Sequence, residues 1–465
     1  MARYDMYRSV RRVHMVGIGG SGMCGIAEIL LDEGYTVTGS DMNVTPITER
    51  LIKLGAKVTA GHSPENIEGT DVVVISSAVK ESNVEVSEAR KLQIPVIRRA
   101  EMLGELMRTK YGVAVAGTHG KTTTTSMLGM ALEDSSLDPT VIVGGRLKAL
   151  GGHARRGMSE LFVAEADEFD RSFLRLTPSI AVVTNIDTDH LDCYGNLDGI
   201  MDAFAEFVNR VPFYGTVVAC MDDANLVSLF PRIERRMFTY GQSAQAELQA
   251  RDISHGDGGS VCSVYRAGEL LGELRMQVPG THNVQNALAA VAVGLELGVD
   301  FATISESLGR FNGVHRRGEI KGEAAGRLVF DDFAHHPTEI RAILDALRLG
   351  WSRPVVAVFQ PHLYSRTRDL AADFGGSFMQ SDILLVTEIY GSRETALPGV
   401  TGELVAEAAR EHGHRQVHYV PNKDGLAERL AELSSPGDLV VTIGAGDIYK
   451  TGEQLLELLR QEDDK

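Results

Sequence analysis

Gly120-Lys121-Thr122 is the feature of this sequence whose chemistry is most specific. The triplet follows an apolar run at residues 111–116 and precedes a helix-like stretch. It matches the core of a phosphate-binding loop, in which backbone N–H groups surround phosphates, lysine reaches the β- and γ-phosphates, and threonine ligates Mg²⁺. The usual pattern places a glycine at position 115, where this chain has Val115. The predicted loop therefore begins later and comprises Gly117, Thr118, His119, Gly120, Lys121, Thr122 and Thr123.

Two acidic segments follow apolar runs downstream of this loop. The first is Glu165-Ala-Asp-Glu-Phe-Asp170, and the second is Asn185-Ile-Asp-Thr-Asp189-His190. Parallel α/β sheets place ligands at the carboxyl ends of their strands, and a phosphate-binding loop needs a carboxylate to complete Mg²⁺ binding. Isolated acids would be read as solvated loop residues or helix caps, but two clusters after such a loop favour a metal site. His190 alone fits either a loop histidine or a neutral metal ligand.

A second glycine cluster lies near the N-terminus. Gly17, Gly19 and Gly22 match G-x-G-x-x-G between a strand-like run and a helix, and Asp41 follows the next strand-like run. Glycine permits the tight turn, and the helix N-terminus presents N–H groups to a diphosphate. The pattern fits NAD(P) or any other nucleotide diphosphate, and it also fits a tightly packed turn without a ligand. An NAD-dependent dehydrogenase or a nucleotide-sensing protein is therefore an alternative, although it leaves the phosphate-binding loop unused.

Several polar clusters follow later strand-like runs. Asn283 opens an Ala-rich helix and is either an N-cap or an adenine-binding amide. Asp332 belongs to an Asp-Asp…His-His segment that fits either a metal or catalytic site or a capped loop. His362 and Arg366 suit carboxylate or phosphate binding, and a polar surface loop explains them equally well.

The elements that must position these residues alternate along the chain. Short apolar runs without alternation are typical of parallel strands buried on both faces. They are expected at residues 13–18, 72–76, 111–116, 161–164, 180–184, 355–358, 383–387 and 439–443. Helices are expected at residues 26–33, 122–134, 199–210 and 284–297. The fold class is therefore α/β with doubly wound sheets, and residues 246–279 are expected to add antiparallel strands to the middle domain.

Composition limits the function further. A chain of 465 residues suggests about three domains. The formal charge of −17 argues against a nonspecific nucleic-acid partner, and no run of about 18 apolar residues predicts a membrane span. The four cysteines form no C-x-x-C pair, and the N-terminus has no signal-peptide pattern, so a reducing cytoplasm is expected.

The order of these motifs resembles the Mur ligases over nearly the whole chain. The resemblance rests on GIGGSGMCGIAEIL, GTHGKTTTT, EADEFD, TNIDTDHLD, GTHNVQNALAA, HRR, DDFAHHPTE and QPHLYSRT. It implies an N-terminal Rossmann-like domain for a UDP-sugar at residues 1–109, a central ATPase at residues 110–314, and a C-terminal Rossmann-like domain for an amino acid at residues 315–465. It also implies the short form of the phosphate-binding loop seen here.

The branch it resembles most joins L-alanine to the lactyl carboxylate of UDP-N-acetylmuramate, using ATP and two Mg²⁺ ions, in peptidoglycan precursor synthesis. The alternative within the family is a recycling ligase that attaches a tripeptide to the same UDP-sugar. A monomer or weak homodimer is expected. Phe333 and Leu363 depart from the family pattern, which has Tyr and Arg at these positions.

The resemblance also implies roles for individual residues. Lys121, His190, His362 and Arg366 would be catalytic, and Thr122, Glu165 and His190 would bind the metal ions. Asn283, Arg316 and Asp332 would complete the ATP site. The UDP-sugar would be bound by Gly19, Gly20, Ser21, Gly22, Ser40, Asp41, Ser76 and Arg98.

Overall fold

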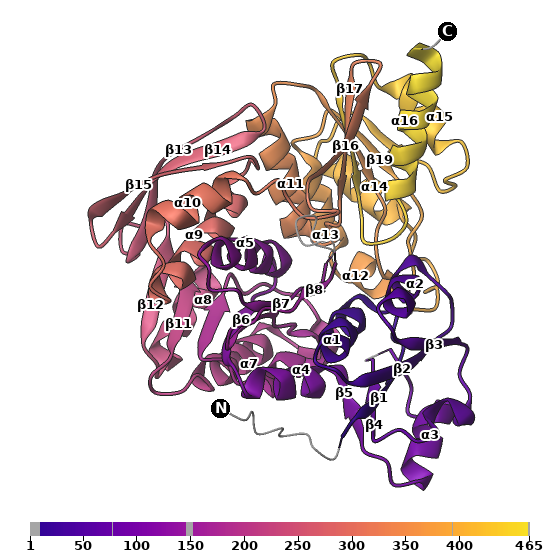
Figure 1. The fold of residues 1–465 in the computed structure, drawn as a ribbon. Helices are drawn as coiled ribbons and strands as arrows, with labels where there is room; N and C mark the ends of the chain where they lie inside the picture. Colours follow the sequence, from indigo (N-terminus) through magenta and orange to yellow (C-terminus); the bar gives the residue numbers. More distant parts are fainter. Residues whose placement is uncertain (1–9, 77, 146–151, 393, 464–465) are drawn as a thin grey trace. The chain divides into compact units, whose positions relative to one another are not determined.

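The computed structural model describes residues 10–463, except for residues 77, 146–151 and 393. The described chain contains three sheets covered by helices, which confirms the three-domain α/β fold class (Figure 1). It divides into two compact units. One comprises residues 1–249, 264–272 and 285–308, and the other comprises residues 250–263, 273–284 and 309–465.

The first sheet is entirely parallel, with the strand order β3-β2-β1-β4-β5. Its strands are β1 (Arg12–Val16), β2 (Thr36–Asp41), β3 (Lys57–Ala60), β4 (Val72–Ile75) and β5 (Val96–Arg98). The helical elements between them are α1 (Ser21–Asp32), α2 (Pro46–Lys53), η1 (Pro64–Ile67), α3 (Val84–Lys91) and α4 (Arg99–Arg108). The chain reverses direction across the sheet between β1 and β4, and such a switch point is where doubly wound sheets bind ligands.

The second sheet has the order β15-β14-β13-β12-β11-β10-β6-β9-β7-β8. Its strands are β6 (Tyr111–Ala116), β7 (Thr140–Ile142), β8 (Ala154–Arg155), β9 (Leu161–Glu165), β10 (Ile180–Val183), β11 (Thr216–Cys220), β12 (Met237–Gly241), β13 (Leu248–Gly256), β14 (Gly259–Arg266) and β15 (Glu269–Met276). Its helical elements are α5 (Lys121–Asp134), η2 (Phe169–Arg175), α6 (Leu191–Tyr194), α7 (Leu197–Asn209), α8 (Ala224–Leu229), η3 (Phe230–Arg232), α9 (Thr281–Glu296) and α10 (Phe301–Gly309). Antiparallel strands were expected within residues 246–279, where β13, β14 and β15 extend the sheet, and β13 pairs parallel with β12.

The third sheet has the order β16-β17-β21-β18-β19-β20, and only its edge strand β16 runs antiparallel to its neighbour. Its strands are β16 (Glu319–Ala324), β17 (Arg327–Asp332), β18 (Val355–Phe359), β19 (Ile383–Val386), β20 (Val417–Tyr419) and β21 (Leu439–Ile443). Its helical elements are α11 (Pro337–Gly350), α12 (Tyr364–Asp369), α13 (Ala371–Gly375), η4 (Gly376–Phe378), α14 (Glu403–Glu411), α15 (Leu426–Leu433) and α16 (Tyr449–Asp463).

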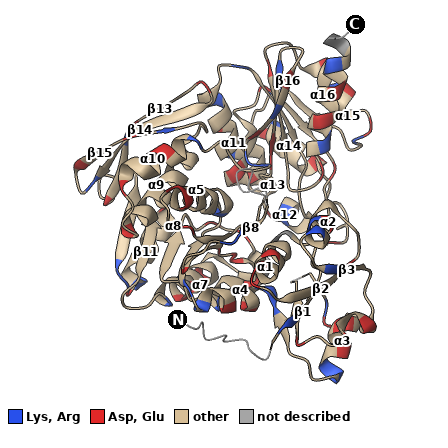
Figure 2. Cartoon of the chain, viewed as in Figure 1, with Lys and Arg blue, Asp and Glu red and all other residues tan. Residues whose placement is uncertain are grey.

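Central strands are buried along their whole length, as in β4, β10, β18 and β21. Because both faces are covered by helices, these strands are continuous apolar runs rather than alternating ones. Charged residues of both signs are mixed along the outer helices, such as α3 and α16 (Figure 2). Among the described helices, none has the length and apolar character needed to cross a membrane.

Candidate functional site

The phosphate-binding loop joins β6 to α5, as the sequence predicts. Gly117 and Gly120 both have positive φ, +133° and +82°, and Gly120 is the N-cap of α5. A Cβ atom on Gly117 would overlap the Thr184 hydroxyl, and one on Gly120 would lie 2.5 Å from Asn286 Oδ1. Glycine is therefore required at both positions for backbone conformation and for space.

Lys121 is the first residue of α5, and its side chain folds back over the loop that precedes it. Its Nζ donates hydrogen bonds to the carbonyls of Gly117, at 2.7 Å, and Thr118, at 3.1 Å, and it lies 2.7 Å from Glu168 Oε2. Burial alone would lower the pKa of Lys121, but the charges of Glu168, Asp167 and Glu165 outweigh it, so the pKa is raised. The site therefore presents a fixed cation to the place where phosphate oxygens would lie.

Glu168 is the partner of this lysine and was part of the predicted acidic cluster. Only 3% of the residue is exposed. Burial raises its pKa to about 7, against the opposing effect of Lys121. Its backbone carbonyl accepts a hydrogen bond of 2.6 Å from the Tyr194 hydroxyl.

Thr122 and Glu165 lie together at the carboxyl end of β9. The Thr122 hydroxyl is 3.0 Å from each carboxylate oxygen of Glu165, and the backbone N–H of Gly144 donates to Glu165 Oε2 at 2.7 Å. A hydroxyl and a carboxylate are hard oxygen ligands of the kind that Mg²⁺ prefers. These two side chains fit the metal role expected for them.

His190 lies beside the buried glutamate. Its Nε2 is 3.9 Å from Glu168 Oε1 and 3.9 Å from Asp189 Oδ2, and its ring packs edge-on against Phe169 at 5.1 Å. His190 has a φ of +55°, which directs the chain into α6. The structure therefore brings this histidine to the same strand ends as the P-loop lysine.

His119 occupies the middle of the loop. Its backbone N–H donates to Asn185 Oδ1 at 2.8 Å, and its Nε2 lies 3.1 Å from Asp187 Oδ2. The Thr184 hydroxyl and the Asn185 amide both donate to the His119 carbonyl. The second acidic segment thus supports the loop directly.

Asp170 and Arg171 form a strained turn just after Glu168. Their φ values are +56° and +54°, and neither residue is glycine. Each such residue costs about 1 to 3 kcal/mol and persists only where surrounding contacts enforce it. Here the Arg171 N–H donates to the Glu168 carbonyl, and Arg98 donates to Asp170 Oδ2 at 2.8 Å. Strain of this kind is concentrated at functional sites.

Asn286 supports the P-loop helix in a way that the sequence did not indicate. Its Oδ1 accepts a hydrogen bond of 3.1 Å from the Thr124 hydroxyl, and the residue is buried. In the sequence it follows Asn283 by three residues, a spacing that places both asparagines on one face of a helix. Asn283 donates from Nδ2 to the Pro279 carbonyl at 2.8 Å. Of the two asparagines, Asn286 therefore contacts the P-loop helix.

The N-terminal glycine loop lies at the switch point of the first sheet. Gly17 has a φ of +77°, and a Cβ atom on it would lie 3.3 Å from Ser76 Cβ. The Gly19 N–H donates to Asp41 Oδ2 at 2.9 Å, and Gly20 precedes the first turn of α1. This brings together the expected UDP-sugar residues of the loop, β2 and β4. The side chain of Ser21 lies outside the described residues.

Ser40 joins a buried polar network below this loop. Its hydroxyl donates to Glu85 Oε2 at 2.6 Å, and the same oxygen lies 3.1 Å from His62 Nδ1. Burial would raise the pKa of Glu85, but hydrogen bonds from His14, Ser40 and Asn66 outweigh it and lower the pKa to about 2. The sequence motifs did not single out Glu85, since it is one acid within an ordinary amphipathic helix.

Arg98 ends β5 and Arg99 begins α4, and both side chains pair with acids of the segment that follows β9. Arg98 pairs with Asp170, whereas Arg99 Nη2 lies 3.2 Å from Asp167 Oδ2. Arg99 was not predicted as a site residue, although it adjoins Arg98 in the sequence.

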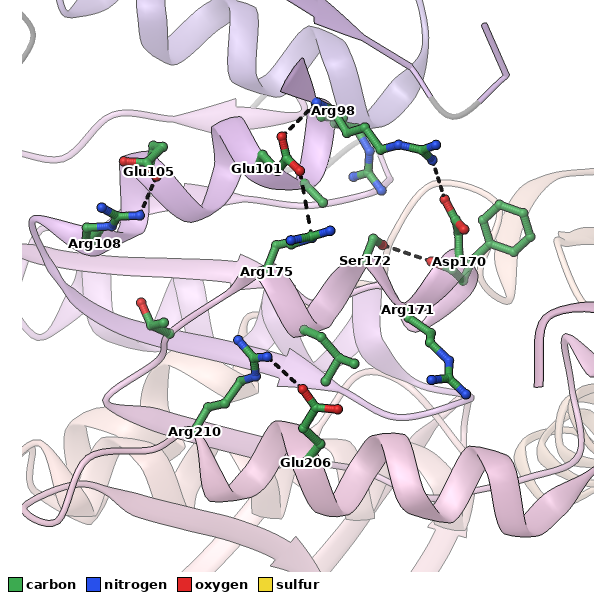
Figure 3. A pocket seen from close by; sticks show the side chains of 15 residues that line it. Arg98, Glu101, Glu105, Arg108, Asp170, Arg171, Ser172, Arg175, Glu206 and Arg210 are labelled. Carbon is green, nitrogen blue, oxygen red and sulfur yellow. Dashed lines mark hydrogen bonds and ion pairs between the residues drawn. The ribbon is translucent and has the colours of Figure 1, made fainter. Parts of the chain in front are cut away.

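A cavity of about 760 Å³ lies between α4, η2 and α7 (Figure 3). Most of its charged side chains pair with one another, as Arg108 does with Glu105 and Arg210 with Glu206. Two of its lining residues, Arg99 and Phe169, also contact the candidate site described above.

In the second unit, the Arg316 side chain forms hydrogen bonds at the carboxyl ends of β17 and β21. Its Nε donates to Asp331 at 2.8 Å, and its other nitrogens donate to the Gly444 and Gly446 carbonyls at 2.7 and 3.0 Å. Its guanidinium also lies over the rings of Phe333 and Tyr449. The expected role of Arg316 on ATP phosphates stays a prediction, and within this unit the side chain ties strand ends together.

Asp332 ends β17 and organises the loop around it. It accepts hydrogen bonds from the Gly318 N–H at 2.6 Å and from the Ala334 N–H at 2.7 Å. Burial raises its pKa to about 7, although Arg317 opposes this effect.

His362 and Arg366 follow β18 and lie together. His362 Nδ1 is 3.4 Å from Arg366 Nη1, and the His362 ring stacks on Tyr390 with centroids 6.1 Å apart. Between them Leu363 is buried, with a φ of +69°, and Phe333 lies 5.5 Å from His335. Phe333 is thus connected to His362 through the His335 ring, which lies 5.7 Å from the His362 ring, whereas the Leu363 backbone N–H donates to the Tyr390 carbonyl.

Three family models match consecutive parts of the chain. They are the Mur ligase family catalytic domain over residues 12–111, the Mur ligase middle domain over residues 115–294, and the Mur ligase glutamate ligase domain over residues 316–446. Together they span all three sheets.

Similar proteins match the chain along its whole length. The UDP-N-acetylmuramate–L-alanine ligase of Syntrophotalea carbinolica is 52% identical over 458 residues, covering 98% of this chain and 100% of the relative. The protein of the same name from Salinibacter ruber is 52% identical over 455 residues, covering 97% of this chain and 96% of the relative.

Two solved structures are similar as well. The UDP-N-acetylmuramate–alanine ligase of Thermotoga maritima is 30% identical with a TM-score of 0.82, covering 98% of this chain and 100% of that chain. A murein peptide ligase from Psychrobacter arcticus is 25% identical with a TM-score of 0.71, covering 97% of this chain and 99% of that chain.

Proposed function

Because the chain belongs to the Mur ligase family, we propose that its three sheets divide the substrates of one reaction among them. The enzyme is an ATP-dependent ligase that joins L-alanine to UDP-N-acetylmuramate in peptidoglycan synthesis. We assign the UDP-sugar to residues 1–109, ATP to residues 110–314, and the amino acid to residues 315–465. We further propose that the enzyme works in the cytoplasm as a monomer or weak homodimer.

The observation that carries this assignment is the arrangement of Lys121, Thr122 and Glu165 at adjoining strand ends. A phosphoryl group at this place would meet a fixed cation and a pair of oxygen ligands suited to Mg²⁺. We propose that Thr122 and Glu165 hold one Mg²⁺ ion, and that Glu165 and His190 hold a second. The ions would supply positive charge to the phosphoryl oxygens.

In the proposed mechanism the lactyl carboxylate attacks the γ-phosphorus of ATP, which forms an acyl phosphate and releases ADP. The amine of L-alanine then attacks the acyl carbon, and phosphate leaves. Lys121 neutralises charge on the transferring group, so catalysis depends on positioning and electrostatic stabilisation. His362 and Arg366 are proposed to position the amino acid and the muramoyl end in the second step.

Changing Lys121 to Ala tests the first step. We expect turnover to fall by about 100-fold or more, because the fixed cation is lost from the transferring phosphate, while UDP-N-acetylmuramate binding stays unchanged. ADP release and calorimetric titration measure the two effects. Lys91→Ala is the matched control, since Lys91 is exposed on α3 and pairs with Glu88. A Lys121→Ala enzyme with normal turnover would refute the assignment.

A panel of co-substrates separates the alanine ligase from the tripeptide ligase, to which the chain is less similar. Phosphate release is measured with UDP-N-acetylmuramate and either L-alanine or an L-alanyl tripeptide. Turnover with the tripeptide alone would contradict the alanine assignment.

A further inference from the structure

The Arg99 side chain lies against Gly22 in the first turn of α1, although the two residues are far apart in the sequence. A Cβ atom built on Gly22 would lie 2.7 Å from Arg99 Nη1 and 3.1 Å from Cζ. The guanidinium therefore occupies space that any other residue at position 22 would need. It adds a full positive charge to a helix N-terminus, which already favours anions.

The other side of the same guanidinium contacts the acidic segment at residues 165–170. Arg99 Nη2 lies 3.2 Å from Asp167 Oδ2, and Asp167 also accepts hydrogen bonds from the Phe169 N–H and the Ser172 hydroxyl. Asp167 immediately precedes Glu168, which pairs with Lys121. One side chain thus links the glycine loop of the first sheet to the P-loop lysine of the second.

Arginine suits this double role because its planar group carries five donors. A single contact to Asp167 leaves other N–H groups for phosphate oxygens. The side chain is 22% exposed, so it keeps access to a ligand at α1 while its position is fixed by packing.

We propose that Arg99 is a substrate-positioning residue that binds the diphosphate of the UDP-sugar and holds it at a set distance from Lys121. This inference rests on the proposed assignment of the UDP-sugar to the first domain. The lactyl carboxylate is joined to the diphosphate through the sugar. Fixing one end therefore limits where the carboxylate can meet the γ-phosphate.

The test combines binding and kinetics in the full chain with Arg99→Gln, Arg99→Lys and Gly22→Ala. For Arg99→Gln we expect UDP-N-acetylmuramate to bind at least tenfold more weakly in calorimetry, while the affinity for ATP stays within twofold. Arg99→Lys should recover part of the loss, because it restores the charge without the planar fork. Gly22→Ala should weaken UDP-sugar binding too, because its methyl group displaces the guanidinium without removing the charge.

Arg108→Gln is the matched control, because Arg108 ends the same helix and pairs with Glu105 in that helix. It should bind both nucleotides as the parent does. UDP-N-acetylmuramate affinity within twofold of the parent in Arg99→Gln would overturn the proposal. Equal losses of affinity for UDP-N-acetylmuramate and ATP in Arg99→Gln, together with a lower melting temperature, would also overturn it, since that pattern indicates a structural role. Failure of the parent enzyme itself to bind UDP-N-acetylmuramate would instead contradict the domain assignment.

Discussion

At the residue scale, the buried carboxylates of this enzyme differ in what their surroundings do to them. Glu85 receives hydrogen bonds from Ser40 and Asn66, and its pKa falls to about 2. For Glu168 and Asp332, burial has the larger effect, and each pKa rises to about 7. The same side-chain chemistry thus gives a permanent anion in the first domain and titrating groups in the other two.

Asp332 should make stability depend on pH. Between about pH 4 and pH 7 the folded chain holds a proton on Asp332 that the unfolded chain has lost. The free energy of unfolding therefore falls as pH rises through this window, by at most about 1.4 kcal/mol per pH unit. Asp332→Asn should flatten this slope.

Urea unfolding at pH 5, 6 and 7 measures the effect in the ligand-free enzyme. Trp351 is the single tryptophan of the chain and lies 4.9 Å from Phe330, in the same unit as Asp332, so its fluorescence reports on this unit. Parallel pH slopes in the parent and in Asp332→Asn would contradict the prediction. Asp369→Asn serves as the control, because Asp369 is an exposed acid paired with its neighbour Arg368.

At the element scale, the strand-turn-helix unit of the P-loop depends on Gly120 for two separate reasons. An alanine there would have to adopt a φ of +82°, and its Cβ would lie 2.5 Å from Asn286 Oδ1. The left-handed conformation alone costs about 1 to 2 kcal/mol, and the contact adds to it. We expect Gly120→Ala to weaken ATP binding by about tenfold or more.

Asn286→Ala should restore part of that affinity in the double variant, because it removes the contact but not the backbone strain. Binding of a non-hydrolysable ATP analogue and thermal unfolding measure the two contributions. Gly34→Ala is the control for strain alone, since Gly34 has a φ of +89° and a Cβ atom there would have no described atom within 4 Å. It should lower stability without changing nucleotide affinity. If the double variant binds the ATP analogue no more tightly than Gly120→Ala does, the contact with Asn286 does not contribute to the loss of affinity.

The sequence predicted the strands better than the starts of the helices. β6 and β21 agree with the expected residues, because a buried parallel strand is a short apolar run. The first helix was expected from residue 26, but α1 begins at Ser21. Glycines weaken helical propensity there, yet a Cβ atom on Gly25 would lie only 3.3 Å from the His153 carbonyl oxygen, so the packing of α1 favours glycine at this position. Packing contacts between residues far apart in the chain do not appear in the hydrophobic periodicity of the sequence, so the start of α1 could not be predicted from it.

The same limit applies to the candidate site. Local motifs indicated Lys121, Thr122 and Glu165, since each follows a recognisable strand. Arg99 and Asn286 were missed because their partners, Gly22 and Thr124, lie on other elements far away in the sequence. Their roles depend on side-chain packing between helices, which residue types alone do not specify.

At the scale of the whole molecule, the two loops proposed to bind phosphate lie on two different sheets of a chain with a net charge of −17. Under this proposal each loop attracts its anion locally, through a helix N-terminus and nearby cations such as Arg99 and Lys121. The proposed metal ligands Thr122 and Glu165 lie beside the second of these loops.

Removing divalent metal should therefore affect the proposed ATP site and leave the proposed UDP-sugar site unchanged. With excess EDTA we expect turnover to stop, because the proposed Mg²⁺ ligands serve ATP. UDP-N-acetylmuramate should still bind with nearly unchanged affinity in calorimetry. Restoring Mg²⁺ should restore ADP release. Loss of UDP-sugar binding upon chelation would show that the first loop also depends on the metal.

The strained turn at Asp170 and Arg171 also shows how far the geometry of one segment depends on the rest of its unit. Two consecutive left-handed residues need contacts from elsewhere to hold this conformation. Those contacts come from Arg98 at the end of β5 and, through the Glu168 carbonyl, from Tyr194 on α6. The backbone beside Glu168 is therefore set by elements far away in the sequence, and its conformation is a property of the unit rather than of the segment alone.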